Sequence, residues 1–159
     1  MKKIATLIST YNEADRILDV VASVQSISTD IIILDNYSTD ETVALVRDLP
    51  GVTVVKHNIP PTNYKERIRL FFDTLDSIES QTEYVTHLIC SERFTSAFCD
   101  YLKKQDIFKY DAIACYRNAV TDEYPTHPYH LVYLIRSILK RHKTVRLLKR
   151  GQWNENACK

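Results

Sequence analysis

The chain has 159 residues, a formal net charge of +1 and an apolar content of 45%, which are ordinary values for one globular domain. No apolar run approaches the roughly 18 residues that a membrane-spanning helix requires, so the sequence predicts no spanning segment. The four cysteines are widely spaced and form no C-x-x-C pair, which argues against a zinc ribbon or a thioredoxin-like site and favours reduced thiols. We therefore expect a single cytoplasmic domain, residues 1–159.

Short apolar runs alternate with helical patterns from the start of the chain. Strands are predicted at residues 4–9, 30–34, 52–55, 84–90, 111–117 and 144–149. Helices are predicted at residues 14–26, 42–49, 64–78, 96–105 and 129–141. This alternation predicts an α/β fold, a mostly parallel sheet with helices on both faces. Because such sheets bind ligands at the carboxyl ends of their strands, the loops that follow the strands are the candidate sites.

The first candidate loop reads S-T-Y-N-E-A and follows the strand at 4–9. Thr10 and Glu13 have the spacing of a capping box and can simply begin a helix. Tyr11 and Asn12 have no such explanation, and an aromatic ring and an amide beside a helix N-terminus suit a nucleobase or a phosphate. With only two glycines, the chain has no Gly-rich phosphate loop.

The second candidate loop reads L-D-N-Y-S-T-D-E-T. Ser38 and Glu41 again have capping-box spacing. Asp35 ends a strand that is apolar throughout, at the edge where a carboxylate can accept a hydrogen bond from a base or a ribose. The alternative is that Asp35 only forms a local turn.

Taken together, these segments resemble a known family. The run ATLISTYNEADRILDVVASV, followed by DIIILDNYSTDETV, is similar to the N-terminal half of family-2 glycosyltransferases, which have the Rossmann-like GT-A fold. Further along, LICSERF falls where a lipopolysaccharide-core-like subgroup shows L-D-A-D-E-R, and TVRLLKRGQW resembles its R-L-F-R-R-G segment. The resemblance implies a nucleotide-binding half at about 1–94 and an acceptor-side half at about 95–159.

The resemblance also implies an activity and a set of site residues. Members of the family move a sugar from a nucleotide-sugar donor to an acceptor, here a glycan or a lipid-linked molecule. Carried over, the family pattern assigns Thr10, Tyr11, Glu13 and Asp35 to the nucleotide, alongside the neighbouring Asn12. In the family, the carboxylates of a D-x-D motif bind a divalent metal that bridges the donor pyrophosphate and helps the leaving group depart.

This chain departs from the family at the D-x-D motif. Ile89 and Ser91 stand at the two aspartate positions, which leaves Glu92 as the only candidate metal ligand. One carboxylate can hold Mg²⁺ together with substrate phosphates, so Mg²⁺ or Mn²⁺ is expected only when the donor is bound. We expect Ser91, Glu92 and Arg93 to face the donor pyrophosphate or sugar, and Arg93 or a basic segment can neutralise it without metal. Alternatively, Glu92 and Arg93 cap the helix that begins near Thr95.

An inverting transfer needs a carboxylate that deprotonates the acceptor hydroxyl. Asp122 and Glu123, in the loop after the fifth predicted strand, are the adjacent acids in the second half of the chain that fit this role. The alternative interpretation is that both are solvated loop residues.

The C-terminal part of the sequence is basic. From Arg136 onward it has eight lysines and arginines against a single acid, Glu155, so residues 136–150 suit an anionic partner such as a phosphate, a lipid headgroup or a nucleic acid. A solvated helix face is the other interpretation. Relatives usually continue beyond the R-R-G segment, so we expect the lid over the donor sugar to be missing or supplied by a partner protein. Peripheral association with a membrane is compatible with these features.

Two other classes of function compete with the enzyme. The missing aspartates favour a degenerate glycosyltransferase domain that acts as a binding or scaffold protein. A different Rossmann-like nucleotide protein, such as a nucleotidyltransferase, is the third class, and the absence of a Gly-rich loop argues against it.

Overall fold

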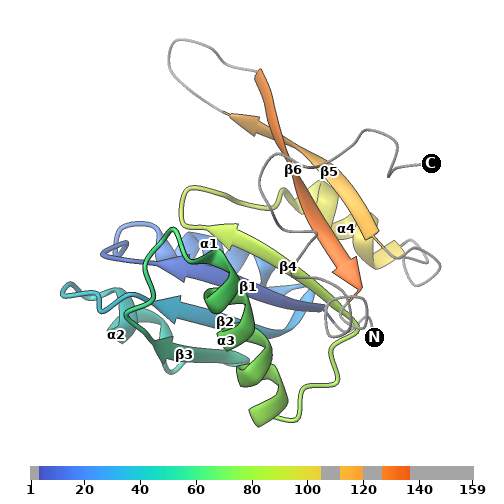
Figure 1. Ribbon diagram of the computed structural model, residues 1–159. Helices are drawn as coiled ribbons and strands as arrows, with labels where there is room; N and C mark the ends of the chain where they lie inside the picture. The colour runs from blue at the N-terminus through green and yellow to red at the C-terminus, as the bar shows by residue number, and fades with distance from the viewer. Residues whose placement is uncertain (1–3, 105–111, 120–126, 137–159) are drawn as a thin grey trace.

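The computed structural model describes residues 4–104, 112–119 and 127–136, the last two as backbone only. They form one six-stranded sheet with the order β3-β2-β1-β4-β6-β5. The strands are β1 (Ile4–Thr10), β2 (Ser28–Asp35), β3 (Val52–Lys56), β4 (Tyr84–Ile89), β5 (Ala112–Ala119) and β6 (His127–Arg136). Strands β1 to β4 are parallel, whereas β6 runs antiparallel to both β4 and β5. The predicted mostly parallel sheet is therefore confirmed (Figure 1).

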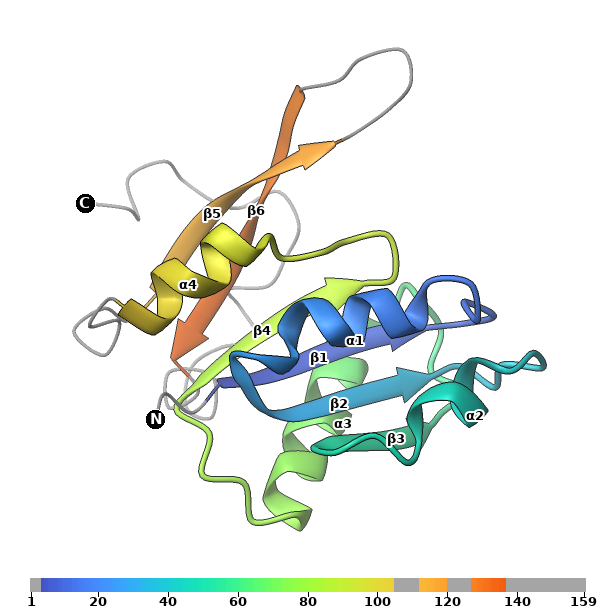
Figure 2. The same ribbon diagram turned by 180° about the vertical axis from the view of Figure 1, so that it is seen from behind.

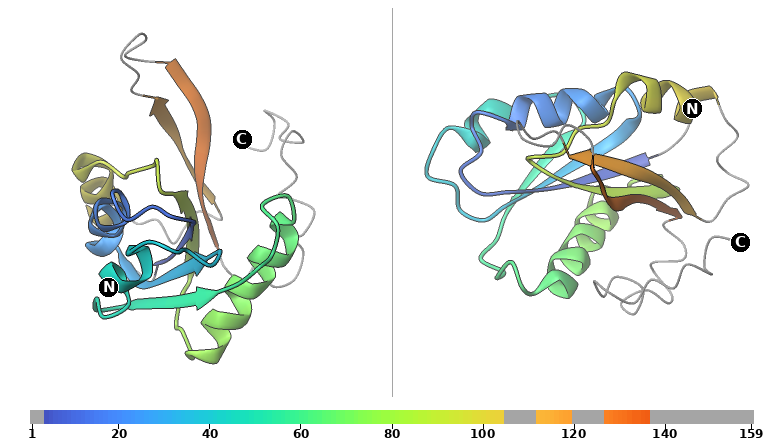
Figure 3. Two further views of the ribbon diagram at one scale, coloured as in Figure 1. Left: turned by 90° about the vertical axis from the view of Figure 1, so that its left-hand side faces the viewer. Right: turned by 90° about the horizontal axis from the view of Figure 1, so that it is seen from above.

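Helices cover both faces of the parallel strands, as the sequence predicted. They are α1 (Ile17–Gln25), α2 (Thr42–Val46), α3 (Tyr64–Ser77) and α4 (Ser96–Lys104). Helices α1, α2 and α4 lie on the face seen in Figure 2, and α3 lies on the other, as the end-on view in Figure 3 shows.

Each face of the sheet has its own apolar core. Ile4 and Ile8 of β1 pack in the cluster that includes α1 and α4, whereas Ala5 and Leu7 pack in the cluster that includes α3. Successive side chains of a strand point to opposite faces, so a strand covered by helices on both sides must be apolar at every position. This explains the uninterrupted apolar run of β2.

One predicted element is wrong. Residues 129–141 were expected to form a helix, but residues 127–136 form β6, which pairs along its length with β5. The run L-V-Y-L-I within it is rich in β-branched and aromatic residues and fits a strand as well as a helix. Pairing with β5 decided the outcome. The strand predicted at 144–149 lies outside the described residues.

The cysteine and membrane expectations can be checked in part. Cys90 and Cys99 are free and buried, as expected of reduced thiols, and side-chain detail at the other two cysteines lies outside the described part of the chain. None of the described helices is long and apolar enough to cross a membrane.

Candidate functional site

The loops that the sequence singled out meet at one edge of the sheet. Thr10 at the end of β1 is the register partner of Asp35 at the end of β2. On the other side of β1, Ser9 is the partner of Ile89 at the end of β4. Because β1 to β4 are parallel, all four carboxyl ends lie together (Figure 1). The sequence predicted that Thr10, Asp35 and Ser91 surround one cleft. Thr10 lines the cleft at this edge, whereas Asp35 and Ser91 are not among its lining residues.

The first two loops are joined through Asn12. Its backbone N–H donates to Ser38 Oγ at 2.9 Å, and its side-chain Oδ1 accepts from the Thr39 N–H at 2.8 Å. Asn12 has a φ of 51°, in the left-handed region that Asn tolerates better than most residues. The Asn12 amide therefore holds the second loop, whereas the sequence predicted that it contacts the nucleotide.

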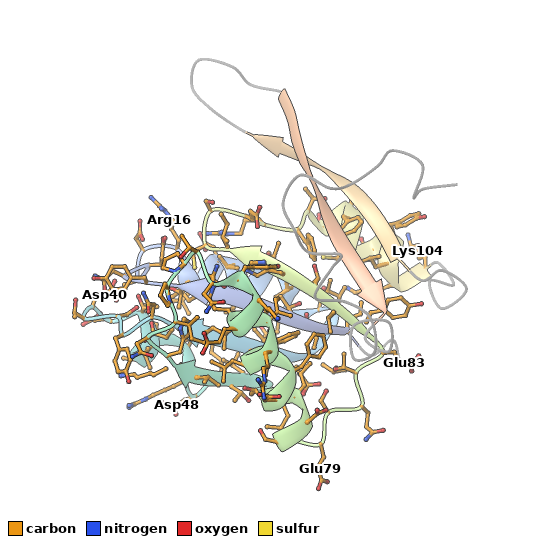
Figure 4. The ribbon with its side chains drawn as sticks, viewed as in Figure 1. Arg16, Asp40, Asp48, Glu79, Glu83 and Lys104 are labelled. Atoms are coloured by element: carbon orange, nitrogen blue, oxygen red, sulfur yellow. The ribbon has the colours of Figure 1, made fainter. Side chains whose placement is uncertain are left out.

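Two further bonds extend this junction. The Glu13 N–H donates to Thr42 Oγ1 at 2.8 Å, and the Ala14 N–H donates to Asp40 Oδ2 at 3.1 Å. Asp40 also accepts from the Thr42 hydroxyl and N–H, which lowers the pKa of its carboxyl. We call these bonds and those of Asn12 the loop junction. Figure 4 shows Asp40 at the edge where the strand arrows end.

The loop junction replaces both predicted capping boxes. Thr10 belongs to β1, and α1 begins only at Ile17 with no side-chain cap. Likewise, no side chain caps the N-terminus of α2 at Glu41. The backbone N–H groups of residues 12–14 donate to side chains of the second loop. Because these residues do not start a helix, α1 begins later than predicted.

Asp35 is fully buried. Its relative exposure is 0%, and its two carboxylate oxygens accept from the Ser38 N–H at 3.0 Å and from the Ser38 hydroxyl. This is the geometry of the local turn that the sequence left open as the alternative. Any ligand contact by Asp35 has to be shared with Ser38.

A cleft of about 350 Å³ opens at this edge. Of the residues predicted to bind the nucleotide, it is lined by Thr10, Tyr11 and Glu13. The other lining residues are Ser9, Leu34, Asn36, His57, Ile59, Pro61, Arg67 and Ile89. The volume is within the range of pockets that hold small ligands.

Two lining residues were missed by the sequence reasoning, His57 and Arg67. Burial and the positive charge of Arg67 lower the pKa of His57, and its Nδ1 accepts from the Ile59 N–H at 3.0 Å. Burial also lowers the pKa of the Arg67 guanidinium. His57 follows β3 directly, in one of the loops that the sequence predicted as candidate sites. Arg67 interrupts the apolar stripe of Tyr64, Ile68 and Phe71 on α3, which was an available signal.

Thr10 has a polar atom without a conventional partner. The residue is 6% exposed. Its hydroxyl oxygen is buried and makes no hydrogen bond of ordinary geometry with the other described residues. It lies beside the Cys90 thiol, whose pKa is raised by burial and partly lowered again by this hydroxyl. Buried hydroxyls are normally satisfied; this one is covered by protein atoms, and the Cys90 thiol is its polar neighbour.

A chain of side-chain contacts fixes the floor and wall of the cleft. His87 of β4 bridges Ser9 Oγ, at 3.1 Å from its Nε2, and the Tyr64 hydroxyl, at 3.2 Å from its Nδ1. The Arg67 guanidinium then lies over the Tyr64 ring, 5.6 Å from its centroid. This chain links β1, β4 and α3 and fixes the position of Arg67.

The β4 loop forms a tight turn. The Glu92 N–H donates to the Ile89 carbonyl at 2.9 Å, and the Glu92 carboxylate accepts from the Ile89 N–H at 2.9 Å. Ser91 is exposed, and Ile89 is 40% exposed at the cleft. The helix that follows, α4, is capped by Thr95, whose hydroxyl accepts from the Phe98 N–H, so Glu92 and Arg93 are not its caps.

Arg93 is engaged with the protein backbone. Its guanidinium donates to the carbonyls of Cys90, Glu92 and Arg16 at 2.7, 2.8 and 3.0 Å. These bonds tie the β4 loop to the start of α1. Few N–H donors of Arg93 therefore remain to bind a donor pyrophosphate.

The residues at this edge do not fit a divalent metal. Hard cations need several oxygen ligands, but the side chain at 89 is apolar and the Glu92 carboxylate is occupied by a backbone N–H. Among the described residues, no three His, Cys, Asp or Glu side chains come together as a metal site.

Some predicted site residues cannot be placed. Asp122 and Glu123, the predicted catalytic carboxylates, lie outside the described residues. The same holds for the basic segment beyond Arg136. Both stay predictions.

A mostly parallel sheet with helices on both faces and a cleft at its carboxyl edge defines a Rossmann-like fold of the GT-A type. The fold is similar to that of Staphylococcus aureus TarS, residues 1–349, with a TM-score of 0.57 and 15% identity over 89% of this chain and 49% of that one. It is also similar to a 4-diphosphocytidyl-2C-methyl-D-erythritol synthase from Anaerococcus prevotii, with a TM-score of 0.54 and 15% identity over 87% of this chain and 71% of that one. Residues 6–60 match the family model of glycosyl transferase family 2, so this segment is similar to members of that family.

Curated relatives match part of the chain. An uncharacterized glycosyltransferase of Rickettsia prowazekii is 45% identical over 56 residues, and one of Rickettsia typhi is equally similar. Each match covers 35% of this chain and 19% of the relative. The chain thus covers about a fifth of the length of these relatives.

Proposed function

We propose that the protein binds a nucleotide-sugar donor in the cleft at the carboxyl edge of the sheet and transfers the sugar to a glycan or lipid-linked acceptor. The observation that carries this proposal is the coincidence of two independent features. The segment that matches glycosyl transferase family 2 contains Thr10, Tyr11 and Glu13, and these same residues line the cleft.

The lining residues suggest how a donor would lie. Tyr11 is 57% exposed at the cleft, and an exposed aromatic ring offers a stacking surface for a nucleobase. The Glu13 carboxylate supplies a polar partner beside it. The diphosphate would then extend towards Ile89 and Arg67 on the opposite side of the cleft. We propose that Asp35, Glu92 and Arg93 hold these loops in place, whereas the exposed Ser91 keeps its predicted place beside the donor pyrophosphate or sugar.

The acceptor side of the proposal rests on sequence alone. Asp122 or Glu123 would deprotonate the acceptor hydroxyl, and residues 136–150 would meet an anionic acceptor or membrane surface. A partner protein that completes the acceptor site belongs to the same proposal.

A second function has its own supporting observation. Ile89 and Ser91 at the D-x-D positions, with the Glu92 carboxylate bound to the backbone, suit a degenerate domain that binds nucleotide without transferring a sugar. The two functions differ in turnover and agree on the cleft.

The experiment has a binding arm and a turnover arm. Calorimetric titration with UDP, GDP, CDP and ADP tests the cleft, and release of the nucleoside diphosphate from the matching nucleotide sugars tests transfer. Tyr11→Ala should weaken binding roughly 5- to 100-fold, the range for loss of one base–aromatic stack. Tyr37→Ala is the matched control, because Tyr37 is also 57% exposed but does not line the cleft.

Three outcomes distinguish an active transferase, a degenerate nucleotide-binding domain and a protein that binds no donor in this cleft. Binding with turnover supports the transferase. Binding without turnover on any donor supports the degenerate domain. Equal effects of Tyr11→Ala and Tyr37→Ala, or no binding of any nucleotide, would reject the cleft as the donor site.

A further inference from the structure

We propose that Arg67 takes the place of the divalent cation and neutralises the donor diphosphate directly, so that nucleotide binding in this cleft is independent of metal. This inference rests on the proposed function, because it names the group that meets the diphosphate of the same donor. It goes beyond that function by replacing a metal with a specific side chain of α3.

The first argument is the charge inventory of the cleft. Among the described residues that line the cleft, Arg67 is the one permanent cation and Glu13 the one carboxylate. Glu13 is paired with Arg16 at 3.3 Å. No carboxylate of the described residues lies within ion-pair distance of Arg67. A half-buried guanidinium without an anionic partner is costly, and an anionic ligand would relieve that cost.

The second argument is the donor capacity of the guanidinium. One Nη donates to the Pro61 carbonyl at 2.8 Å, while the Nε is buried without a partner. A guanidinium has five N–H donors in a rigid fork that matches phosphate oxygens. Because the Nε is covered by protein atoms, the donors that Arg67 keeps for a ligand are the remaining Nη N–H groups.

The third argument is preorganisation. The Tyr64 ring under the guanidinium is fixed by His87, which is fixed in turn by Ser9. The neighbouring His57 has its Nδ1 occupied by the Ile59 N–H, so its Nε2 is the nitrogen left to carry the proton. A cation held on a rigid element binds an anion without first losing side-chain freedom.

The alternative cation at this edge is Arg93, and the geometry disfavours it. Its guanidinium is bound to three backbone carbonyls, and the residue does not line the cleft. Asp19 also lies 3.9 Å from it. Arg67 and Arg93 therefore differ: Arg93 joins two loops, whereas Arg67 lines the cleft and has no carboxylate of the described residues within ion-pair distance.

The test compares Arg67→Gln with Arg69→Gln. Arg69 is on the same helix, its side chain is 83% exposed, and it pairs only weakly with Asp73 at 3.8 Å, so it controls for the loss of one positive charge from α3. Each variant is titrated with the best-binding nucleoside diphosphate and with the corresponding nucleoside, in EDTA and in Mn²⁺.

The expected result has three parts. The wild type binds the diphosphate in EDTA as well as in Mn²⁺. Arg67→Gln weakens diphosphate binding about tenfold or more, the usual effect of losing a charged hydrogen bond, and leaves nucleoside binding unchanged. Arg69→Gln changes neither.

Two results would overturn the inference while leaving the proposed function intact. One is diphosphate binding that requires Mn²⁺ in the wild type. The other is an equal affinity of Arg67→Gln and Arg69→Gln for the diphosphate. Absence of all nucleotide binding would instead reject the proposed function together with the inference.

A second variant guards against a folding artefact. Arg67→Lys keeps the charge but loses the fork, so it should bind the diphosphate with an affinity between those of the wild type and Arg67→Gln. Circular dichroism shows whether Arg67→Gln is folded. If it is not, Arg67→Lys is compared with Arg69→Lys instead. Equal affinities of these two variants for the diphosphate would overturn the inference.

Discussion

The Thr39 N–H donates to the side-chain Oδ1 of Asn12 at 2.8 Å, across 27 residues of sequence. Together with the bond from the Asn12 N–H to Ser38, it makes Asn12 the link between the loops that follow β1 and β2. Such a link sets the width of the cleft edge without occupying the cleft. It also explains why an amide with a positive φ stands between two residues that line the cavity.

Asn12→Ala should lower the free energy of unfolding by about 1–2 kcal/mol, because it removes an acceptor and places Ala in the left-handed region. Asn12→Asp keeps both an acceptor and tolerance of this φ and should lose least. Asn12→Gly relieves the backbone but not the hydrogen bond and should fall between them. Urea denaturation of the three variants gives the order, and equal stabilities of Asn12→Ala and Asn12→Asp would show that the side-chain bond contributes nothing.

Asp35→Ala should cost about 1–3 kcal/mol of stability, because it leaves the two Ser38 donors without their acceptor in a buried site. A carboxylate that only bound a ligand would be removable at much smaller cost. Urea denaturation measures the loss, and titration with a nucleoside diphosphate below the unfolding transition measures affinity. Unchanged stability with a large drop in affinity would return Asp35 to the role of a ligand-binding residue.

His57 should make stability depend on pH. Burial first, and then the charge of Arg67, lower the pKa of His57 below its ordinary value of 6.5. The unfolded chain then binds more protons than the folded one as the pH falls past 6.5. The His57 contribution is therefore fully present above about pH 6.5 and is lost as the pH falls towards the folded pKa.

The prediction is checked by comparing the free energies of unfolding of the wild type and His57→Asn. Asn can still accept from the Ile59 N–H but does not titrate. Free energies of unfolding measured at pH 8, 7, 6 and 5 should diverge below about pH 6.5, with the wild type losing more. Parallel curves would mean that His57 has the same pKa in the folded and unfolded chains.

Sequence reasoning recovered the parallel strands and four helices, because each is short, strongly periodic and bounded by polar loops. It failed at residues 127–136, where an apolar run fits both a helix and a strand and pairing with β5 decides. Among the site residues, Thr10, Tyr11 and Glu13 could be found because family motifs and strand ends coincide. His57 and Arg67 could not be singled out, because their importance depends on burial and on missing counter-charges, which are three-dimensional properties.

For a related reason, the role of Asn12 could not be predicted, and the role of Asp35 was left open between a ligand contact and a local turn. An amide or a carboxylate in a loop can bind a ligand or a neighbouring backbone group with equal chemistry. Only the position of Ser38 and Thr39 relative to these side chains shows that the second loop already takes their hydrogen bonds.

The last prediction concerns the positions where the family has metal-binding aspartates. Ile89 is 40% exposed at the cleft and Ser91 is exposed, so aspartates at both positions would bury no new charge. Ile89→Asp combined with Ser91→Asp should create a Mn²⁺ dependence of nucleotide binding that the wild type lacks, because three carboxylates including Glu92 would offer the charged oxygens that a hard cation requires.

The stability of the double variant supplies an independent readout. Without metal, the added carboxylates repel one another and Glu92, so the melting temperature should fall below that of the wild type. Mn²⁺ should restore it, since a ligand that binds only the folded state stabilises that state. The combination Ile89→Asn with Ser91→Asn has similar side-chain volumes without the charges, and its melting temperature should respond to neither EDTA nor Mn²⁺. If the wild type itself gains stability from Mn²⁺ without nucleotide, the assignment of Ile89 and Ser91 to the aspartate positions is wrong.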